Sequence, residues 1–439
     1  VDPAPPPAPV AAPPAIAVAT PTPVAVVAPE SSTGDTHAAA APNPWVETAR
    51  DHLSTFAADV DTASYTYSRR ALDGGALPPA AAVRVEEFVN AFKYRFGAPT
   101  AGSPFAVVMD AAPSPFDARH HVVRVGVATP GKALSQRAPM NLVFLVDVSG
   151  SMDQPDKLGL AKQALRELVA ALGPADSVAL VTYAGSTEVV LPAVSGAEHR
   201  QLLAAIDRLR ADGSTAMGSG LELAYQQARA RLSAKAASRV IVLSDGDANV
   251  GPSSLDEMLR IIDRGRQDGV TLSTIGFGMG NYRAELMEQL GDRGNGNNYY
   301  VDSAAAARKL FTTDLVAMLE VAAKDVKLQV DFDPAMVARY RLLGYENRAI
   351  ADADFRVDSV DAGGGAGDLG DLGQRPALRV LGAAQHVGEA SHRGGEPQVG
   401  GRAGEARGRP RRHREGRLAG RVGVAGPRRL VADPHRAQR

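Results

Sequence analysis

Cysteine is absent from the 439-residue sequence, and its absence excludes disulfide bridges and metal sites built from thiolates. An excess of charge of one sign is also missing: the formal net charge is −1, which predicts no general attraction to nucleic acid or to an anionic membrane. Aromatic residues make up only 5% of the chain. The remaining composition, 45% hydrophobic and 22% charged, is that of a globular protein, and the length allows two or three domains.

A long apolar run that could cross a membrane is missing as well. The longest apolar stretch, residues 1–29, contains ten prolines, which lack the backbone donor that a spanning helix needs. Residues 1–43 are rich in Pro and Ala without helical or strand periodicity, so we expect a disordered tether, partly in the polyproline II conformation. An unstructured end without a role is the alternative. Because the chain begins at Val1, we expect an upstream start that carries an export signal.

Residues 139–322 alternate between short apolar runs and amphipathic segments. The apolar runs are rich in Val, Leu and Ile, as strands buried on both faces are, and they cover residues 141–146, 177–183, 239–243 and 271–277. Between them, apolar residues recur at helical spacing, for example at Leu165, Leu168 and Leu172. This alternation predicts an α/β fold with a doubly wound, mostly parallel, Rossmann-like sheet. Residues 187–194 predict an additional antiparallel edge strand.

The two flanks of this region have different patterns. Residues 44–138 predict an N-terminal α+β module with a helix over 84–96 and a strand over 121–128. The apolar face of that helix consists of Val85, Phe88, Val89 and Phe92. Residues 323–361 alternate apolar and polar positions, and they predict the start of a β-rich domain.

Residues 362–439 do not resemble a protein core. They lack Ile, Phe, Tyr, Trp, Met, Lys, Asn and Thr, and apart from Ser391 they consist of the ten amino acids whose codons can begin with G or C. We expect this tail, with fifteen Arg against seven acidic residues, to be disordered. Out-of-frame translation of a GC-rich gene produces this composition. A natural Arg/Gly-rich tail that binds RNA or another polyanion is the alternative, but it does not explain the missing Lys and Thr.

One loop carries most of the chemistry. A hydrophobic strand leads into Asp147-x-Ser149-x-Ser151, which places one carboxylate and two hydroxyls on the loop at the carboxyl end of that strand. Ligands of open α/β sheets bind at this edge. Hard cations such as Mg²⁺ take oxygen ligands in octahedral geometry and keep several waters, so hydroxyls backed by carboxylates suit them.

Two later segments supply further oxygen ligands. Gly-Ser-Thr215 lies between two amphipathic helices and offers another hydroxyl, and a second buried strand ends in Ser-Asp245-Gly-Asp247. We therefore expect Asp147 and Asp245 at the ends of neighbouring strands, within reach of one ion. Asp247 and Asn249 are expected to brace the turn. Each piece alone could be a tight turn or a helix cap, but three pieces in this order, each at an element boundary, favour a metal site.

Together these motifs resemble the metal-ion-dependent adhesion site (MIDAS) of von Willebrand factor type A (VWA) domains. The resemblance implies that Ser149, Ser151 and Thr215 ligate the cation directly, and that Asp147 and Asp245 act mainly through bound water. It implies Mg²⁺ as the cofactor, with Ca²⁺ or Mn²⁺ as alternatives. In this family the open coordination position takes an acidic residue of a partner, so the expected partner is a protein that presents an Asp or Glu.

The flanking segments narrow the resemblance. Residues 54–65 and 77–90 resemble the N-terminal module of a bacterial VWA subfamily often labelled Ca-activated chloride channel homologues. The likeness covers residues 43–361, and the family continues into a C-terminal domain that residues 323–361 begin. Many members look like envelope lipoproteins, which implies the periplasm or outer surface and a lipid anchor upstream. The channel label is not expected to apply, because no segment predicts a membrane span; no feature specifies an oligomeric state.

Two classes of function follow from these motifs. The first is a metal-dependent protein-binding module for adhesion or scaffolding, and the second is a metal-dependent hydrolase that uses the same cation. The first is favoured, and no enzyme activity is expected, because no general base or nucleophile accompanies the site. Asp59-Val-Asp61 resembles the nucleophile loop of haloacid-dehalogenase-like phosphatases, but Ala63 stands where that motif needs Thr or Val. The nine His show no metal-binding spacing.

Overall fold

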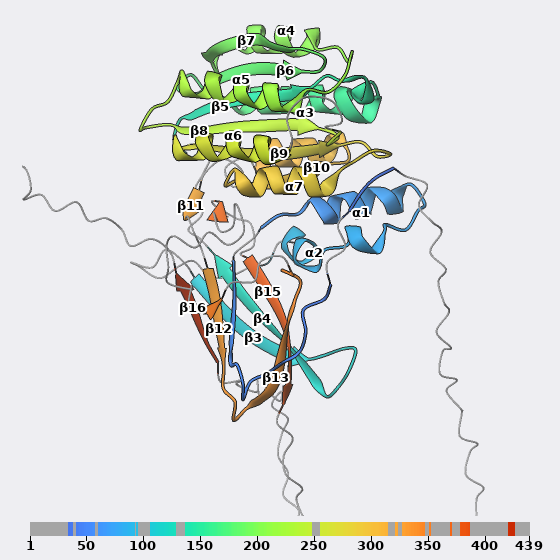
Figure 1. Cartoon of the computed structure of the whole chain (residues 1–439), viewed down its shortest axis with the longest axis vertical. Helices are drawn as coiled ribbons and strands as arrows, with labels where there is room; N and C mark the ends of the chain where they lie inside the picture. Colours follow the sequence, from blue (N-terminus) through green and yellow to red (C-terminus); the bar gives the residue numbers. More distant parts are fainter. Residues whose placement is uncertain are drawn as a thin grey trace, which may run out of the picture.

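The structure is a computed structural model that describes residues 34–37, 41–57, 60–92, 94, 106–128, 137–247, 255–314, 321–323, 327–346, 351–352, 369–370, 378–386 and 420–425. Figure 1 shows a layered α/β domain and a β-rich part, with the helices α1 (Ala63–Asp73) and α2 (Val85–Ala91) between them. The 3₁₀ turn η1 (Ala80–Ala82) connects these two helices. No helix in the described ranges is long and apolar enough to cross a membrane.

The α/β domain is built on a six-stranded sheet in the order β10-β9-β8-β5-β6-β7. The strands are β5 (Met140–Asp147), β6 (Ser177–Tyr183), β7 (Thr187–Ser195), β8 (Ala237–Ser244), β9 (Val270–Phe277) and β10 (Asn298–Val301). All neighbours pair in parallel except β6 and β7, which are antiparallel. The predicted α/β fold, its four central strands and the antiparallel edge strand are confirmed. The short strand β10 is an addition that the apolar pattern did not indicate.

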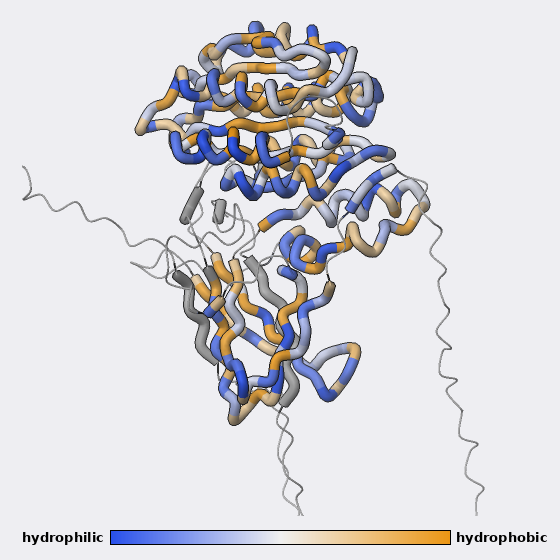
Figure 2. The backbone as a smooth tube through the Cα atoms, viewed as in Figure 1, coloured by the Kyte–Doolittle hydropathy of each residue, from blue (hydrophilic) through white to orange (hydrophobic). Residues whose placement is uncertain are grey.

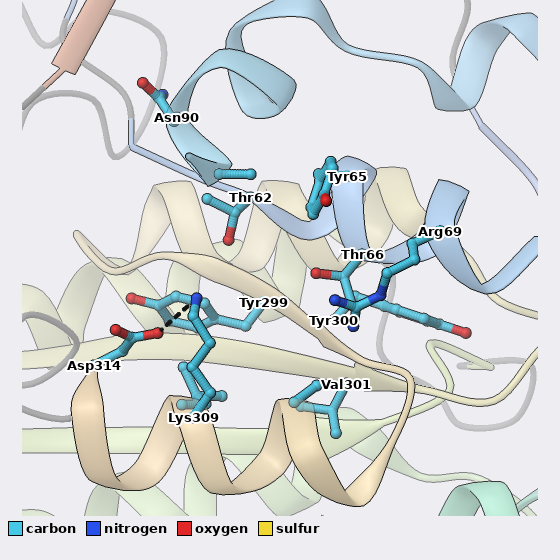
Figure 3. Close-up of a pocket in the computed structure, with 13 residues that line it drawn as sticks. Thr62, Tyr65, Thr66, Arg69, Asn90, Tyr299, Tyr300, Val301, Lys309 and Asp314 are labelled. Carbon is cyan, nitrogen blue, oxygen red and sulfur yellow. Dashed lines mark ion pairs between the residues drawn. The ribbon is translucent and has the colours of Figure 1, made fainter. Parts of the chain in front are cut away.

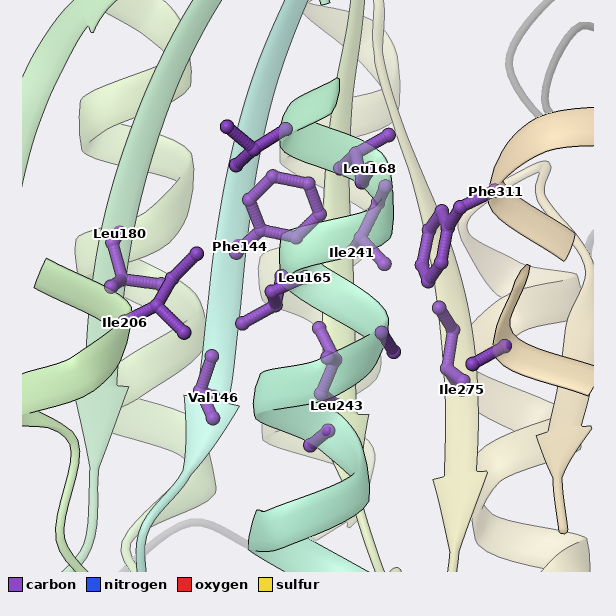
Figure 4. Close-up of a cluster of buried hydrophobic side chains, with 14 of the residues drawn as sticks. Phe144, Val146, Leu165, Leu168, Leu180, Ile206, Ile241, Leu243, Ile275 and Phe311 are labelled. Atoms are coloured by element: carbon purple, nitrogen blue, oxygen red, sulfur yellow. The ribbon is translucent and has the colours of Figure 1, made fainter. Parts of the chain in front are cut away.

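Helices cover both faces of this sheet. One layer contains α3 (Leu160–Ala171), α4 (His199–Arg208), α8 (Ala304–Arg308) and the π-helical turn η5 (Lys309–Thr313). The other contains α5 (Met217–Arg229), α6 (Leu255–Gln267) and α7 (Ala284–Arg293). Because successive side chains of a strand point to opposite faces, Phe144 packs under α3 and Leu145 packs under α5. Figure 4 shows Phe144 beside Leu165 and Ile241 in the first layer.

Hydropathy follows this layering. Figure 2 shows hydrophobic residues along the central strands and hydrophilic residues on the outer surfaces of the helices. All eight residues of β5 are buried, so this strand lies in the centre of the domain. Fully burying a Leu, Val or Phe side chain contributes roughly 1.5–3 kcal/mol, so the two apolar layers fix the sheet and the loops at its edges.

The β-rich part contains a five-stranded sheet in the order β1-β13-β15-β4-β3 and a three-stranded sheet in the order β16-β12-β2. Their strands are β1 (Val46–Glu47), β2 (Leu53–Ala57), β3 (Ala106–Pro113), β4 (His120–Ala128), β12 (Lys327–Phe332), β13 (Val337–Leu343), β15 (Leu378–His386) and β16 (Gly420–Ala425). The strands β11 (Val321–Ala323) and β14 (Leu369–Gly370) form a separate pair. Val123, Val125 and Val127 are buried on β4, as their alternation predicts.

The division of the flanks into separate domains differs from the structure. Strand β1 pairs with β13 and β2 pairs with β12, so the N-terminal module and the C-terminal strands share one β-rich part. The expectation that all of residues 362–439 are disordered is wrong for β14, β15 and β16, since β15 pairs with both β4 and β13. Residues 34–37 make backbone contacts with the α/β domain, so the predicted tether does not extend to residue 43.

Helix α2 also differs from its prediction. It ends at Ala91, and its buried residues are Glu86 and Glu87, whereas Val85 is exposed. The reason is electrostatic: the Arg84 guanidinium pairs with Glu86 at 2.8 Å and with Glu87 at 3.4 Å, and it also pairs with Glu288 of α7. Acidic side chains can be buried when a paired guanidinium and hydrogen bonds surround them in this way. The apolar periodicity therefore identified a helix but not its buried face.

Candidate metal centre

The predicted site residues lie on three loops at the carboxyl edge of the six-stranded sheet. Asp147 is the last residue of β5, and Asp245 directly follows β8. The two strands are parallel neighbours in which Val146 pairs with Leu243. The sheet therefore places the carboxylates of Asp147 and Asp245 side by side at the edge where α/β proteins bind ligands.

The loop after β5 directs two hydroxyls to one place. The backbone N–H of Ser149 donates to Oδ1 of Asp147 at 2.9 Å, which holds the start of the loop. The loop then forms a 3₁₀ turn, η3 (Gly150–Met152), and Oγ of Ser149 and Oγ of Ser151 lie 3.1 Å apart. Two hydroxyl oxygens at this separation can both contact one ion.

The loop that carries Thr215 is tied to the β5 loop by backbone hydrogen bonds. Asp212 N–H donates to the Val148 carbonyl at 2.7 Å, and Gly150 N–H donates to the Gly213 carbonyl at 3.0 Å. Thr215 is buried and lies just before α5. These bonds hold the loop that carries Thr215 against the β5 loop, although the two segments are more than sixty residues apart in sequence.

The carboxylate of Asp147 is fully buried beneath the loops. Its Oδ2 accepts hydrogen bonds from Ser244 Oγ at 2.7 Å and from Tyr183 OH at 3.1 Å. Burial raises the pKa of Asp147 to about 6, while the bonds from Ser149 and Ser244 lower it and the charge of Asp245 raises it further. A nearby cation would offset this burial penalty, so the carboxylate is well placed to stabilise one.

Asp245 has two partners that sequence reasoning missed. Lys157, in the π-helical turn η4 (Pro155–Gly159), places Nζ 3.1 Å from Oδ2 of Asp245, and Asn281 Nδ2 donates to the same oxygen at 3.0 Å. Lys157 also donates to Asn281 Oδ1 at 2.6 Å. Asn281 could have been predicted from the sequence, because it follows strand β9 and the glycines Gly278 and Gly280 at the same edge of the sheet.

The donor set fits a hard cation. Hydroxyl and carboxylate oxygens surround the centre, whereas no group of three or more His, Cys, Asp or Glu suited to a metal occurs in the described part of the chain. Asp147, Asp245 and Lys157 together carry one net negative charge when all three are ionised.

The two residues expected to brace the turn have different outcomes. Oδ1 of Asp247 is buried and accepts no hydrogen bond from the described residues, and Asp247 N–H donates to Asp245 at 3.0 Å. Asn249 lies outside those residues.

Two other features from the sequence lie away from this centre. Asp61 is buried and its Oδ1 accepts the backbone N–H of Asn298 at 3.0 Å, so it connects the helix α1 region to β10. Asp59 lies outside the described residues. Figure 3 shows a pocket of about 240 Å³ between α1, β10 and η5, where Lys309 pairs with Asp314 at 3.1 Å. None of the residues that line this pocket belongs to the candidate metal centre.

Comparison with known families agrees with the fold. Residues 141–313 match the model of the von Willebrand factor type A domain, residues 31–124 match a model described as von Willebrand factor, and residues 317–371 match the C-terminal model of uncharacterized protein YfbK. The chain therefore contains a VWA domain, flanked on both sides by segments that match separate family models. VWA domains typically act as protein-interaction modules.

Two curated relatives align with more of the chain than the VWA domain alone. The chain is 42% identical over 331 residues to uncharacterized protein YfbK of Escherichia coli (strain K12), covering 73% of this chain and 57% of the relative. It is 27% identical over 213 residues to uncharacterized protein sll0103 of Synechocystis sp., covering 48% of this chain and 49% of the relative. The chain thus spans about half the length of these two relatives.

Solved structures are similar at lower identity. A von Willebrand factor type A protein from Catenulispora acidiphila has a TM-score of 0.41 and 19% identity, covering 65% of this chain and 66% of that one. The conserved hypothetical protein BatB from Bacteroides thetaiotaomicron has a TM-score of 0.36 and 17% identity, covering 41% of this chain and 98% of that one.

Proposed function

We propose that this protein holds a divalent cation, Mg²⁺ with Ca²⁺ or Mn²⁺ as alternatives, and uses it to bind an acidic residue of a partner protein. The observation that carries the proposal is the pair of hydroxyls of Ser149 and Ser151, 3.1 Å apart, on a loop held by the buried Asp147. Asp245 lies at the end of the adjacent strand. This arrangement offers oxygen ligands of the type that hard cations require.

The residues divide into two roles in this proposal. Ser149, Ser151 and Thr215 contact the cation directly, and Asp147 and Asp245 hold it through bound water. A cation supplies concentrated positive charge at this edge of the sheet. Because its direct ligands are neutral hydroxyls, much of that charge remains for a partner carboxylate, in a charge-assisted contact.

Lys157 strengthens the case for binding an external carboxylate. Its ammonium already offsets part of the charge on Asp245, so the protein alone does not neutralise a bound Mg²⁺. We propose binding rather than catalysis, because Asp147, Asp245 and Lys157 are each engaged in hydrogen bonds that restrict them as general acids or bases. A hydrolase using the same cation is the alternative class.

We further propose a location at the bacterial cell envelope, in the periplasm or on the outer surface, with a lipid anchor upstream of Val1. The resemblance to an envelope subfamily and the Pro/Ala-rich residues 1–33 support this proposal. Cell fractionation with an antibody against the full chain measures it. Recovery of the protein in the cytosolic fraction alone would contradict it.

The first test is cation binding by the full chain. Mn²⁺ titration followed by electron paramagnetic resonance should show one site in the wild type, and Asp147→Ala should abolish it while the protein stays folded. Asp333→Ala is the matched control, because this exposed Asp also accepts a backbone N–H, that of Ala335, but lies in the β-rich part. Equal Mn²⁺ binding by the wild type and by Asp147→Ala would overturn the proposed site.

The second test concerns the partner. Arrays of short peptides with one Asp or Glu, each paired with its Asn or Gln counterpart, are probed with the protein in Mg²⁺ and in chelator. The proposal expects binding that needs both the carboxylate and Mg²⁺ and is lost in Asp147→Ala. Binding that survives chelation and Asp147→Ala alike would reject it. Metal-dependent hydrolysis of a peptide or phosphoester, lost in the same variant, would instead support the hydrolase.

A further inference from the structure

The N-terminal residues 34–37, here called the anchor segment, lie against residues 278–283, here called the bracing loop. We infer that the anchor segment is a positioning element of the candidate metal centre, and that Asp35, acting through Asn281, sets the cation affinity of Asp245 and its neighbours. The inference rests on the proposed function and extends it to how that site is controlled. Its experiment below separates the failure of one from the failure of the other.

Asp35 provides the main contacts between the two segments. Its Oδ1 accepts the backbone N–H of Gly280 at 2.7 Å and that of Tyr282 at 2.6 Å. Its Oδ2 accepts the hydroxyl of Tyr67, on α1, at 2.8 Å. One carboxylate therefore receives three hydrogen bonds and joins the anchor segment, the bracing loop and the N-terminal helix. Hydrogen bonds to an ionised acceptor are among the stronger ones in proteins.

Backbone pairing and close packing reinforce this attachment. Thr36 N–H donates to the Tyr282 carbonyl at 2.9 Å, and Ala284 N–H donates to the Thr36 carbonyl at 3.3 Å. His37 packs edge-on against the Tyr67 ring, with centroids 4.6 Å apart. A Cβ on Gly34 would lie 2.5 Å from the Gly280 carbonyl oxygen, so the two backbones are in direct contact.

The opposite side of the bracing loop faces the metal centre. Asn281 lies between Gly280 and Tyr282, the two residues whose N–H groups Asp35 binds, and its side chain bonds both Asp245 and Lys157. Arg283 N–H donates to the Asp245 carbonyl at 3.4 Å. Asp35 and Asp245 are thus connected through a single residue, Asn281.

The bracing loop needs an external attachment because its backbone is intrinsically permissive. Gly278 and Gly280 have φ values of +73° and +104°, which residues with a side chain rarely adopt. A Cβ at Gly278 would overlap the Lys157 side chain, so the loop also packs directly on that lysine. Without Asp35, the loop gains conformational freedom. Cation binding must then offset the conformational entropy that is lost when Asn281 and Asp245 become ordered.

The experiment uses the full chain with Mn²⁺ as the probe. Loss of a hydrogen-bonded partner behind a metal ligand typically weakens metal affinity by about 10- to 100-fold. Asp35 acts one residue further away, through Asn281, so Asp35→Ala should raise the Mn²⁺ dissociation constant by roughly 10-fold, the low end of this range. Tyr67→Phe, which removes one of the three bonds and keeps the ring, should raise it by a smaller factor. Asp333→Ala is again the matched control and should leave it unchanged. Thermal unfolding without cation checks that each variant is folded.

A second readout follows from thermodynamic reciprocity. If the anchor segment favours cation binding, the cation must favour attachment of the segment by the same factor. Amide hydrogen exchange in residues 34–37 should therefore slow when Mn²⁺ is added to the wild type. The same residues in Asp35→Ala should show little Mn²⁺ dependence. This measurement stays informative if Asp35→Ala is less stable overall, because Tyr67→Phe should give an intermediate response.

The outcomes distinguish the two proposals. A wild type that binds no Mn²⁺ would overturn the proposed function and this inference together. A wild type that binds Mn²⁺, with Asp35→Ala and Asp333→Ala of equal affinity, would overturn the inference alone. A selective loss in Asp35→Ala, graded through Tyr67→Phe and accompanied by Mn²⁺-dependent protection of residues 34–37, supports it.

Discussion

Nζ of Lys157 lies 3.1 Å from Oδ2 of Asp245, and both side chains are almost completely buried. The pair joins the turn before α3 to the end of β8, inside the candidate metal centre. Asn281 bonds both partners, so the ion pair is fixed in orientation. The protein thus carries its own positive charge where a divalent cation is proposed to bind, and this relationship leads to the first prediction.

Lys157→Met should make the protein unusually dependent on divalent cations. Removing one partner of a buried ion pair leaves the other charge uncompensated and typically costs roughly 3–5 kcal/mol. We expect a loss of this order in chelator, and a larger recovery on adding Mg²⁺ than the wild type shows, because the cation then neutralises Asp245. Urea unfolding with and without Mg²⁺ measures both. Lys162→Met, a partly buried lysine of α3 that bonds the Asp207 carbonyl instead of a carboxylate, is the control. Equal Mg²⁺ responses in the wild type and Lys157→Met would contradict the prediction.

Tyr183→Phe tests the hydrogen bonds that hold the buried Asp147. The Tyr183 hydroxyl donates to Oδ2 of Asp147 at 3.1 Å, and its loss leaves a buried carboxylate less satisfied, at a cost of about 1–3 kcal/mol. The matched control is Tyr225→Phe, because the Tyr225 hydroxyl is also buried but has no hydrogen-bond partner in the described structure. We expect a lower melting temperature and weaker Mn²⁺ binding for Tyr183→Phe alone. Indistinguishable variants would argue against the role of this bond.

Thr215→Ala should separate partner binding from cation binding. Thr215 is one of three proposed hydroxyl ligands, so its removal leaves Ser149, Ser151 and both carboxylates in place. We expect the affinity for a Mg²⁺-dependent acidic peptide to fall by more than the affinity for Mg²⁺ itself, as measured by calorimetry. Ser219→Ala, on the exposed side of α5, is the control. If Ser219→Ala weakened peptide binding to the same extent, the effect would belong to this surface in general and not to the Thr215 hydroxyl.

Glu87→Gln should change how stability depends on pH. Burial raises the pKa of Glu87 from 4.5 to about 8; Arg84 lowers it, and Glu288 and Glu86 raise it. Between these values the folded protein holds a proton that the unfolded chain has released. Stability therefore falls as pH rises from about 5 to 8, by up to about 1.4 kcal/mol per pH unit. Urea unfolding across this range should show a shallower slope for Glu87→Gln than for the wild type. Glu285→Gln, an exposed residue of α7, should keep the wild-type slope.

Local patterns in the sequence were enough to predict most of the α/β domain, all but the short strand β10 of its sheet. The strands β5, β6, β8 and β9 are largely apolar because both of their faces are covered, and this pattern depends only on neighbouring residues. The same is true of Asp147-x-Ser149-x-Ser151, which is short and follows a strand end. The order of strands then explains why Asp147 and Asp245 lie side by side.

Only the tertiary structure decided which residues surround those carboxylates. Lys157 contacts Asp245 across 88 positions and Asp35 contacts Gly280 across 245, and no local periodicity specifies such pairs. The pairing of β2 with β12 likewise joins segments at least 270 residues apart. Helix α2 buries Glu86 and Glu87 beside Arg84, whose guanidinium also pairs with Glu288, 204 positions away on α7, and this reverses the face that apolar spacing predicted. Long-range charge pairing and close backbone packing arise only when distant segments are brought together, so the surroundings of the site were fixed by the fold.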